Sequence, residues 1–190
     1  ITDITDSNAS IGDRAGKDDA WKQGNAPEVS KDNIVTYKIP IKATGDAKSI
    51  SFEDKFDTTC FDAVSSGYCT IEGAEFEEEP QVNQSGTISA KIKEIKDGET
   101  ATITVKLKVK DINTEGKYKN GAKCGNSDWV YDYVKTVKKE APKINKYITS
   151  ITNGNFSGDR SGMSESEKSG SPADAGKNDT EKTITYSQNI

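Results

Sequence analysis

Two nearly adjoining stretches of the sequence decide the fold, residues 87–95 (TISAKIKEI) and residues 101–109 (ATITVKLKV). In each of them apolar and polar residues alternate, which places every second side chain on the same face of an extended strand. In the second stretch Ile103, Val105, Leu107 and Val109 share one face, and the residues between them are polar or charged. Residues 96–99 (KDGE) separate the two stretches with a turn-forming Asp-Gly pair. The pattern predicts two half-buried β-strands joined by a tight turn.

The same alternation recurs along the rest of the chain. It predicts further strands at residues 34–41, 49–56, 117–124 and 130–137, separated by turns rich in Gly, Asp and Asn. The acidic run Glu75–Glu79 is interpreted as a solvated loop between two strands. A series of short alternating strands without long helical patterns is typical of an all-β fold. The sequence therefore predicts an antiparallel β-sandwich.

Composition narrows the possible functions. The 190 residues include 31 acidic and 26 basic side chains, a net charge of −5, and the hydrophobic content of 32% is low for a globular domain. Strands with only one buried face need few apolar residues, so low hydrophobicity is compatible with a stable sandwich. The mild acidity disfavours nucleic acid as a partner, because phosphate contacts need clustered Lys and Arg. No stretch has the length of a membrane-spanning segment, so no membrane insertion is expected.

The chain contains no histidine, which excludes Ser-His-Asp, Cys-His and other histidine-dependent catalysis. An enzyme with turnover is therefore not expected, although a glycosidase that uses only carboxylates stays open as the least favoured alternative. No metal site is predicted either. The oxygen-rich segment from Asp3 to Asp19 could bind calcium, but it lacks the EF-hand pattern, and a solvated loop is the simpler interpretation. No other cofactor is expected.

An internal repeat divides the chain. Residues 1–5 (ITDIT) recur as residues 148–152 (ITSIT), and residues 12–16 (GDRAG) recur as residues 158–162 (GDRSG), at offsets of 147 and 146 positions. Such self-similarity predicts tandem copies of one structural unit. Residues 1–142 are interpreted as one unit whose first strand is truncated. Residues 143–190 are interpreted either as the opening strands of a second copy or as strands donated to a neighbouring subunit.

Four segments resemble repeat domains of bacterial cell-surface and fimbrial proteins. They are residues 35–46 (VTYKIPIKATGD), 97–105 (DGETATITV), 116–122 (GKYKNGA) and 142–148 (PKINKYI). The resemblance implies an immunoglobulin-like sandwich from an adhesin stalk, repeated in tandem and located at the cell surface. Domains of this kind are often locked by an isopeptide bond between a lysine and an asparagine.

The strand registers identify residues for such a bond. Asp54 lies on the same face as Phe52 and Phe56, and Asn120 alternates with lysines, so both side chains are expected to point inward. Asp54 is the predicted promoting acid, while Asn120 and Lys146 are the predicted crosslinking residues. Lys146 belongs to the second copy, so each of the two is expected to bond to a partner outside its own unit.

Two cysteines are predicted to form a disulfide. Cys60 and Cys69 are close enough in sequence to close one loop if the protein is extracellular.

Together these features predict a structural repeat of an extracellular bacterial surface protein, stalk or filament, whose partners are copies of itself. The alternative is a ligand-binding adhesin module that recognises a host or surface polymer.

Overall fold

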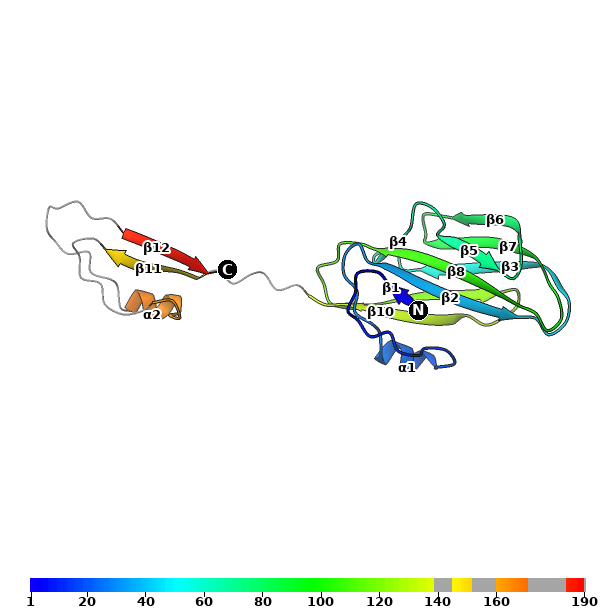
Figure 1. Cartoon of the computed structure of the whole chain (residues 1–190), viewed down its shortest axis with the longest axis horizontal. Coiled ribbons are helices and arrows are strands. Elements are labelled where there is room, and N and C mark those ends of the chain that lie inside the picture. Colours follow the sequence, from blue (N-terminus) through cyan, green and yellow to red (C-terminus); the bar gives the residue numbers. More distant parts are fainter. Residues whose placement is uncertain (139–144, 152–159, 171–183, 190) are drawn as a thin grey trace. The chain divides into compact units, whose positions relative to one another are not determined.

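The computed structural model describes residues 1–138, 145–151, 160–170 and 184–189. The chain folds into two compact units, Ile1–Lys139 and Glu140–Ile190, and each is considered by itself below. The first unit is a sandwich of two β-sheets (Figure 1). This confirms the predicted immunoglobulin-like, all-β fold.

The first sheet is built around a long central strand. Its strands are β1 (Asp3–Ile4), β2 (Ile34–Lys42), β8 (Thr100–Val109), β4 (Phe61–Ala63) and β5 (Cys69–Glu72). β2 pairs with one edge of β8, whereas the short β4 and β5 share its other edge, and all of these pairs are antiparallel. β1 covers only one end of the free edge of β2, through the pairs Asp3↔Thr36 and Ile4↔Val35.

The second sheet has five antiparallel strands in the order β10-β9-β3-β7-β6. They are β10 (Val130–Thr136), β9 (Gly116–Cys124), β3 (Ala47–Phe56), β7 (Thr87–Ile95) and β6 (Phe76–Val82). The turn at residues 96–99 carries the chain from β7 in this sheet to β8 in the other. The alternating stretches that predicted the fold therefore lie in opposite layers of the sandwich.

The inward side chains of both sheets form the core. Phe52, Phe61, Ile88, Ile92, Ile103 and Leu107 are among its largest members, and each is at most 1% exposed. The outward positions of the same strands hold Lys, Glu, Ser and Thr, which explains how a chain of low hydrophobicity supports a continuous core. All strands predicted from alternation are present, with bounds that differ by one or two residues.

The structure corrects the sequence interpretation at several points. The acidic run Glu75–Glu79 is not a loop, because most of it lies in the edge strand β6 and is neutralised by lysines of β7. Lys91 Nζ lies 3.5 Å from Glu78, and Lys93 Nζ lies 3.2 Å from Glu75. The short strands β4 and β5 and the helix α1 (Asp19–Gly24) were not predicted.

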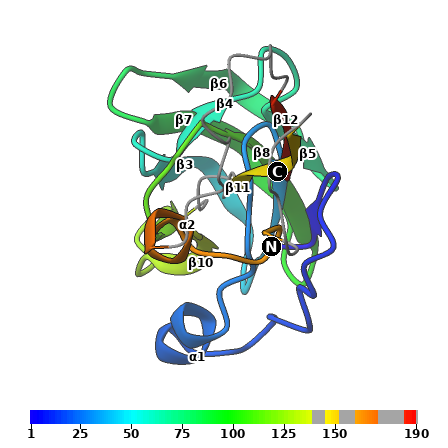
Figure 2. The same cartoon turned by 90° about the vertical axis from the view of Figure 1, so that its left-hand side faces the viewer.

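Helix α1 lies outside the two sheets, next to β10 (Figure 2). Asp18 caps its N-terminus by accepting a hydrogen bond from the backbone N–H of Trp21.

The second unit contains the antiparallel pair β11 (Asn145–Ile151) and β12 (Ile184–Asn189), together with the helix α2 (Glu165–Gly170). Ile151 is buried, and the buried guanidinium of Arg160 donates to the carbonyl of Lys168. The first unit contains the same contact, since Arg14 donates to the carbonyl of Lys22. That these residues open a second copy of the unit remains a prediction.

Two glycines with positive φ test how closely the turns pack against the rest of the unit. Gly73 (φ +79°) and Gly98 (φ +74°) both have left-handed backbone, but a Cβ at Gly73 would lie 2.6 Å from the carbonyl oxygen of Thr100, and one at Gly98 would contact nothing within 4 Å. Gly98→Ala is expected to lower the free energy of unfolding by about 1 kcal/mol through backbone strain alone. Gly73→Ala should cost about 1–3 kcal/mol more, because the backbone must move away. Urea unfolding measures both, and equal losses would contradict the close packing at Gly73.

Candidate functional site

A buried acid–amide pair lies between the sheets of the first unit. Asp54 on β3 is 0% exposed, and Asn120 on β9 is 3% exposed. Their strands are neighbours, with Asp54 opposite Ala122 and Phe56 opposite Asn120, so the two side chains lie diagonally on the inner face. Asn120 Nδ2 donates to Asp54 Oδ1 over 2.6 Å. The predicted inward placement of both residues, side by side, is confirmed, while their chemical roles remain a prediction.

The environment of Asp54 favours its neutral form. Burial among apolar side chains raises its pKa from 3.8 to about 7, although the hydrogen bond from Asn120 opposes this shift. At neutral pH a large fraction of Asp54 is therefore protonated. A carboxylic acid in this state can donate a hydrogen bond, which an ionised carboxylate cannot do.

Two buried polar atoms near this pair lack partners. Asp54 Oδ2 and the hydroxyl of Tyr37 have no hydrogen-bond partner within the part of the chain that the structure describes. Tyr37, on β2 of the facing sheet, is 3% exposed, and burial raises the pKa of its phenol well above 10. Unpaired polar atoms inside a domain are costly, each by roughly 1–3 kcal/mol. A further polar group at this place would find both atoms free to bond to it.

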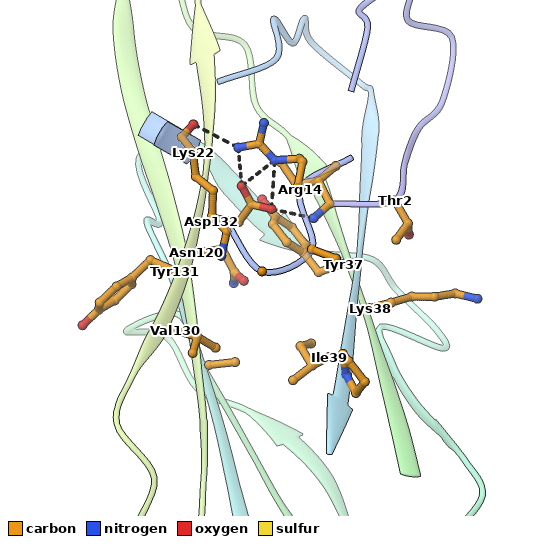
Figure 3. Close-up of a pocket in the computed structure, with 15 residues that line it drawn as sticks. Thr2, Arg14, Lys22, Tyr37, Lys38, Ile39, Asn120, Val130, Tyr131 and Asp132 are labelled. Atoms are coloured by element: carbon orange, nitrogen blue, oxygen red, sulfur yellow. Dashed lines mark hydrogen bonds and ion pairs between the residues drawn. The ribbon is translucent and has the colours of Figure 1, made fainter. Parts of the chain in front are cut away.

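A cavity of about 340 Å³ opens beside the pair, along the seam between the two sheets. Its walls are the free edge of β2 on one side and β9 and β10 on the other, and Tyr37 and Asn120 both line it. Figure 3 shows Ile39 and Val130 pointing toward each other across this seam, whereas Lys38 and Tyr131 point away from it.

A second cavity extends the first along the same seam. Both are lined by Ile39, Pro40, Ala122 and Val130, and the second continues to Ala43 at the end of β2. The two cavities together are called the seam groove below. It is long, open and apolar, with Asn120 as a polar group in its wall.

An ion cluster borders the groove near the chain start. Arg14 is buried and donates through Nε to Asp132 over 2.8 Å, and the α-amine of Ile1 lies 2.6 Å from the same carboxylate (Figure 3). Arg14 also donates to the carbonyls of Lys22 and Asn25 and thereby fixes the end of α1. Burial alone would raise the pKa of Asp132, but the hydrogen bonds from Arg14 and the charge of the amine hold it below its ordinary value.

The sequence alone did not identify Arg14, Tyr37 and Asp132 as residues of the candidate site. A signal existed for Arg14, because it belongs to the repeated Gly-Asp-Arg-x-Gly motif, and the equivalent Arg160 makes the equivalent contact. No sequence signal marks Asp132, which meets Arg14 only because β10 passes α1.

The third predicted residue, Lys146, lies in the second unit. It is on β11 with an exposed side chain, and its Nζ lies 4.4 Å from the ring centroid of Tyr186. The bond from Lys146 to a partner outside its unit remains a prediction.

The predicted Cys60–Cys69 disulfide is not present, since both residues are buried free cysteines. The register of β8 gives the physical reason. Cys69 pairs with Val105, whereas the carbonyl of Cys60 accepts from the N–H of Lys110 on the same edge. Five residues of extended strand separate these positions by ~17 Å. A disulfide allows at most about 7 Å between the α-carbons that it joins.

The acidic residues near the chain start serve local structure. Asp18 caps α1, and Asp13 accepts from the backbone N–H of Ala15. Within the described ranges, no group of His, Cys, Asp or Glu is arranged to hold a metal ion. Among those same residues, no helix has the length and apolar character needed to span a bilayer.

Comparisons with known proteins report on the fold. Neither a protein-family model nor a curated protein sequence matches the chain. Among solved structures, it is similar to the C-terminal domain of the AgI/II polypeptide BspA from Streptococcus agalactiae (14% identity, TM-score 0.46, 68% of this chain and 49% of that one). It is also similar to the collagen-binding domain of a Staphylococcus aureus adhesin (13% identity, TM-score 0.36, 55% of this chain and 88% of that one).

The chain spans about half the length of the BspA structure it matches. The chain is also similar, at a comparable TM-score, to AvmM, which catalyses macrocyclization in alchivemycin A biosynthesis (9% identity, TM-score 0.38, 60% of this chain and 86% of that one). Structural neighbours thus include bacterial surface adhesin domains and an enzyme, and likeness at this level reports the sandwich architecture alone.

The raised pKa of Asp54 predicts how stability depends on pH. The folded state holds the proton of Asp54 up to about pH 7, while the unfolded chain releases it near 3.8. The unfolding free energy should therefore fall as pH rises through this window, by about 2 kcal/mol between pH 5 and pH 7 from this group. Asp54→Asn removes this titrating group. The unfolding free energy of the variant, measured by urea unfolding, should therefore change less between pH 5 and pH 8 than that of the wild type.

The matched control is Asp62→Asn, which alters an exposed carboxylate on β4 and should retain the wild-type pH dependence. Parallel pH profiles for Asp54→Asn and the wild type would contradict a neutral, buried Asp54.

Proposed function

We propose that the first unit is a structural module of an extracellular bacterial surface protein, a stalk or filament, fastened by one isopeptide bond between Asn120 and a lysine. The observation that carries this proposal is the buried Asp54–Asn120 pair, in which the acid favours its neutral form and keeps one oxygen unpartnered, while the asparagine lines the seam groove. The sequence resemblance to surface repeat domains supports the location and the mechanical role.

The chemistry is a single acyl transfer. A neutral lysine amine in the groove attacks Cγ of Asn120, while the protonated carboxyl of Asp54 donates to Asn120 Oδ1 once the carboxamide turns this atom toward it. The new C–N bond forms, the bond from Cγ to Nδ2 breaks, and Nδ2 leaves as ammonia after it takes up the one proton that the amine gives up. Asp54 recovers its proton in the final state. No oxidant, reductant or metal takes part.

The environment suits both reactants. Burial that keeps Asp54 neutral also disfavours a charged ammonium, so a lysine entering the groove is driven toward its nucleophilic form. Ile39, Ala122 and Val130 give the groove apolar walls, and once a strand covered them the exclusion of water would strengthen the hydrogen bond from the acid. Asn120 is consumed in the reaction, so the module performs one turnover and is not an enzyme in the usual sense.

A crosslink at this place serves a mechanical role. Asn120 lies on β9 in one sheet, and a lysine in the groove would belong to a strand beside β2 in the other. A covalent bond between them ties the layers together, and the seam then resists tension that would otherwise separate strands. Partners of the module are proposed to be further copies of the same unit.

Peptide mapping of the protein recovered from its native cell surface tests this proposal. The peptide containing Asn120 is expected to be covalently joined to a lysine-bearing peptide, with a combined mass lower by one ammonia. Asp54→Ala should leave the same peptide linear, because the acid that polarises the carboxamide is gone, whereas Asp62→Ala should not. A linear, full-mass Asn120 peptide from the wild-type surface protein would refute the proposal.

A second candidate function, binding of a surface polymer, is favoured by an aromatic platform at the start of β10. Trp129 and Tyr131 stack with an interplanar angle of 11°, and their rings lie against β9 where Gly121 leaves room. A Cβ at Gly121 would lie 2.6 Å from the ring of Tyr131. Lys119 and Lys123 each place an ammonium over one ring, which adds positive charge to the platform. Such a surface suits an acidic polysaccharide.

Affinity electrophoresis in gels containing hyaluronan or polygalacturonate tests the platform. The wild type should be retarded relative to a gel without polymer, and Trp129→Ala should lose most of the retardation because half of the stacked surface is removed. Val82→Ala changes an exposed apolar residue on β6 and is the matched control. Equal migration of wild type and Trp129→Ala in both polymers would exclude this function for the platform.

A further inference from the structure

The aromatic platform of Trp129 and Tyr131 continues along β10. Val134 and Thr136 are buried at 0% and 3% exposure, so the residues that alternate with them face the outside of the second sheet. Tyr131 and Tyr133 occupy such positions, and Figure 3 shows Tyr131 pointing away from the seam. Trp129 stacks on Tyr131 and so lies on the same side. These three side chains, at alternate positions of the chain, are called the aromatic row below.

Lysines occupy the outward positions of the neighbouring strand β9. Asn120 and Ala122 are buried and line the seam groove, so the residues that alternate with them lie on the opposite face of the sheet. Lys119 pairs with Tyr133 of the aromatic row, and Lys117 and Lys123 lie further along on the same side. The lysines of β9 therefore run parallel to the aromatic row.

Gly121 interrupts these lysines, and Lys55 fills the interruption from the next strand. Gly121 lies opposite Tyr131 on one side and opposite Lys55 of β3 on the other. Lys55 is exposed, and neighbouring strands are only about 4.8 Å apart. One ammonium group is thus present at each successive outward position of β9, which recur every ~7 Å. Lys117, Lys119, Lys55 and Lys123 are called the lysine row below.

Most of the lysine row is not neutralised by the protein. Within the described residues, no acidic side chain forms an ion pair with Lys55, Lys117 or Lys119, and Lys123 pairs with Glu53 over 3.1 Å. The chain as a whole has a net charge of −5, so its basic side chains are outnumbered. A row of free ammonium groups beside aromatic rings in such a chain indicates an anionic partner.

We propose that the aromatic row and the lysine row together form one linear binding site for a polyuronate, a polysaccharide that carries a carboxylate on every sugar. This inference rests on the second candidate function, since it names the ligand of the aromatic platform and extends its site. The polymer lies lengthwise along β9 and β10, with its sugar rings on the aromatic row and its carboxylates toward the lysine row.

The arrangement of the two rows favours this class of ligand. The apolar faces of sugar rings pack on flat aromatic side chains, and the aromatic row offers three of these in line. Because each outward position along β9 has an ammonium group beside it, a polymer with an acid on every sugar uses the whole row. A polymer with an acid on alternate sugars, such as hyaluronan, leaves part of it unpaired.

The length of the site gives the first test. The lysine row extends over six residues of β9, a distance of ~20 Å, so only a chain of several sugars can contact all of it. Isothermal titration of the full chain with oligogalacturonates from dimer to octamer is expected to show affinity rising by about tenfold or more up to the hexamer and then levelling off. A hyaluronan hexamer should bind more weakly than the galacturonate hexamer.

Single variants test the two rows separately. Tyr133→Ala should weaken binding of the galacturonate hexamer about fivefold, because one stacking position is lost. Lys55→Ala and Lys117→Ala change exposed side chains and should each weaken it about two- to fivefold. All three variants should bind the dimer as the wild type does, since a dimer is held by Trp129 and Tyr131.

Lys38→Ala is the matched control. It removes the same charge from an exposed position on β2 in the other sheet, so the affinity for the hexamer should stay unchanged. Urea unfolding of each variant verifies that the fold is retained.

Three outcomes would overturn the proposal. If polygalacturonate binds through Trp129 but the hexamer binds no better than the dimer, or if Tyr133→Ala, Lys55→Ala and Lys117→Ala all bind the hexamer like the wild type, the platform keeps its candidate function and the longer site is wrong. Binding of the hyaluronan hexamer as tight as that of the galacturonate hexamer would refute the polyuronate assignment. If the wild type binds neither polymer, the second candidate function fails as well, whereas the isopeptide proposal, which concerns the opposite face of the sheet, is unaffected.

Discussion

The burial of one carboxyl group governs this structure. Asp54 occupies a position on β3 between Phe52 and Phe56 where alternation demands an apolar side chain, and it is completely buried. The surrounding sandwich supplies a single hydrogen bond, from Asn120, and no positive charge close enough to hold the group ionised. Burial therefore raises the pKa of Asp54 to about 7 and favours the neutral acid, and Oδ2 is left without a partner in the interior.

Alternation made most of the fold predictable because it reflects burial directly. Strands with one face in the core show it clearly, and β2, β3, β7, β8, β9 and β10 all have this form. β6 was not predicted because it is an acidic edge strand. Lys91 neutralises Glu78 on this strand, and Lys93 neutralises Glu75 just before it, which are cross-strand effects that local composition does not reveal. β4, β5 and α1 are too short for a periodic pattern to appear within them.

The candidate site also has a part that the sequence predicts and a part that it does not. The inward facing of Asp54 and Asn120 follows from strand period, and their contact needs only that β3 and β9 be neighbours. The ion cluster of Arg14 and Asp132 is different, because it joins residues 118 positions apart through the course of α1. The disulfide prediction failed for a related reason: nine positions separate Cys60 from Cys69 in sequence, but β8 holds them apart along one extended edge. Sequence spacing limits how far two residues can lie apart, and tertiary pairing decides where they are.

A purely structural account of Asp54 faces an energetic difficulty. An asparagine at this position could keep a hydrogen bond with Asn120 without any charge to bury, and an apolar residue would remove the polar atom altogether. Either would avoid the loss of stability that Asp54 causes as the pH rises toward neutrality. A group that weakens the fold under ordinary conditions, and that is hydrogen-bonded to an asparagine lining the seam groove, supports the proposed chemistry, which needs a proton donor at that place. On this view the core is completed only when a lysine enters the groove, and the cost of burying the acid is offset by a bond that thermal unfolding cannot break.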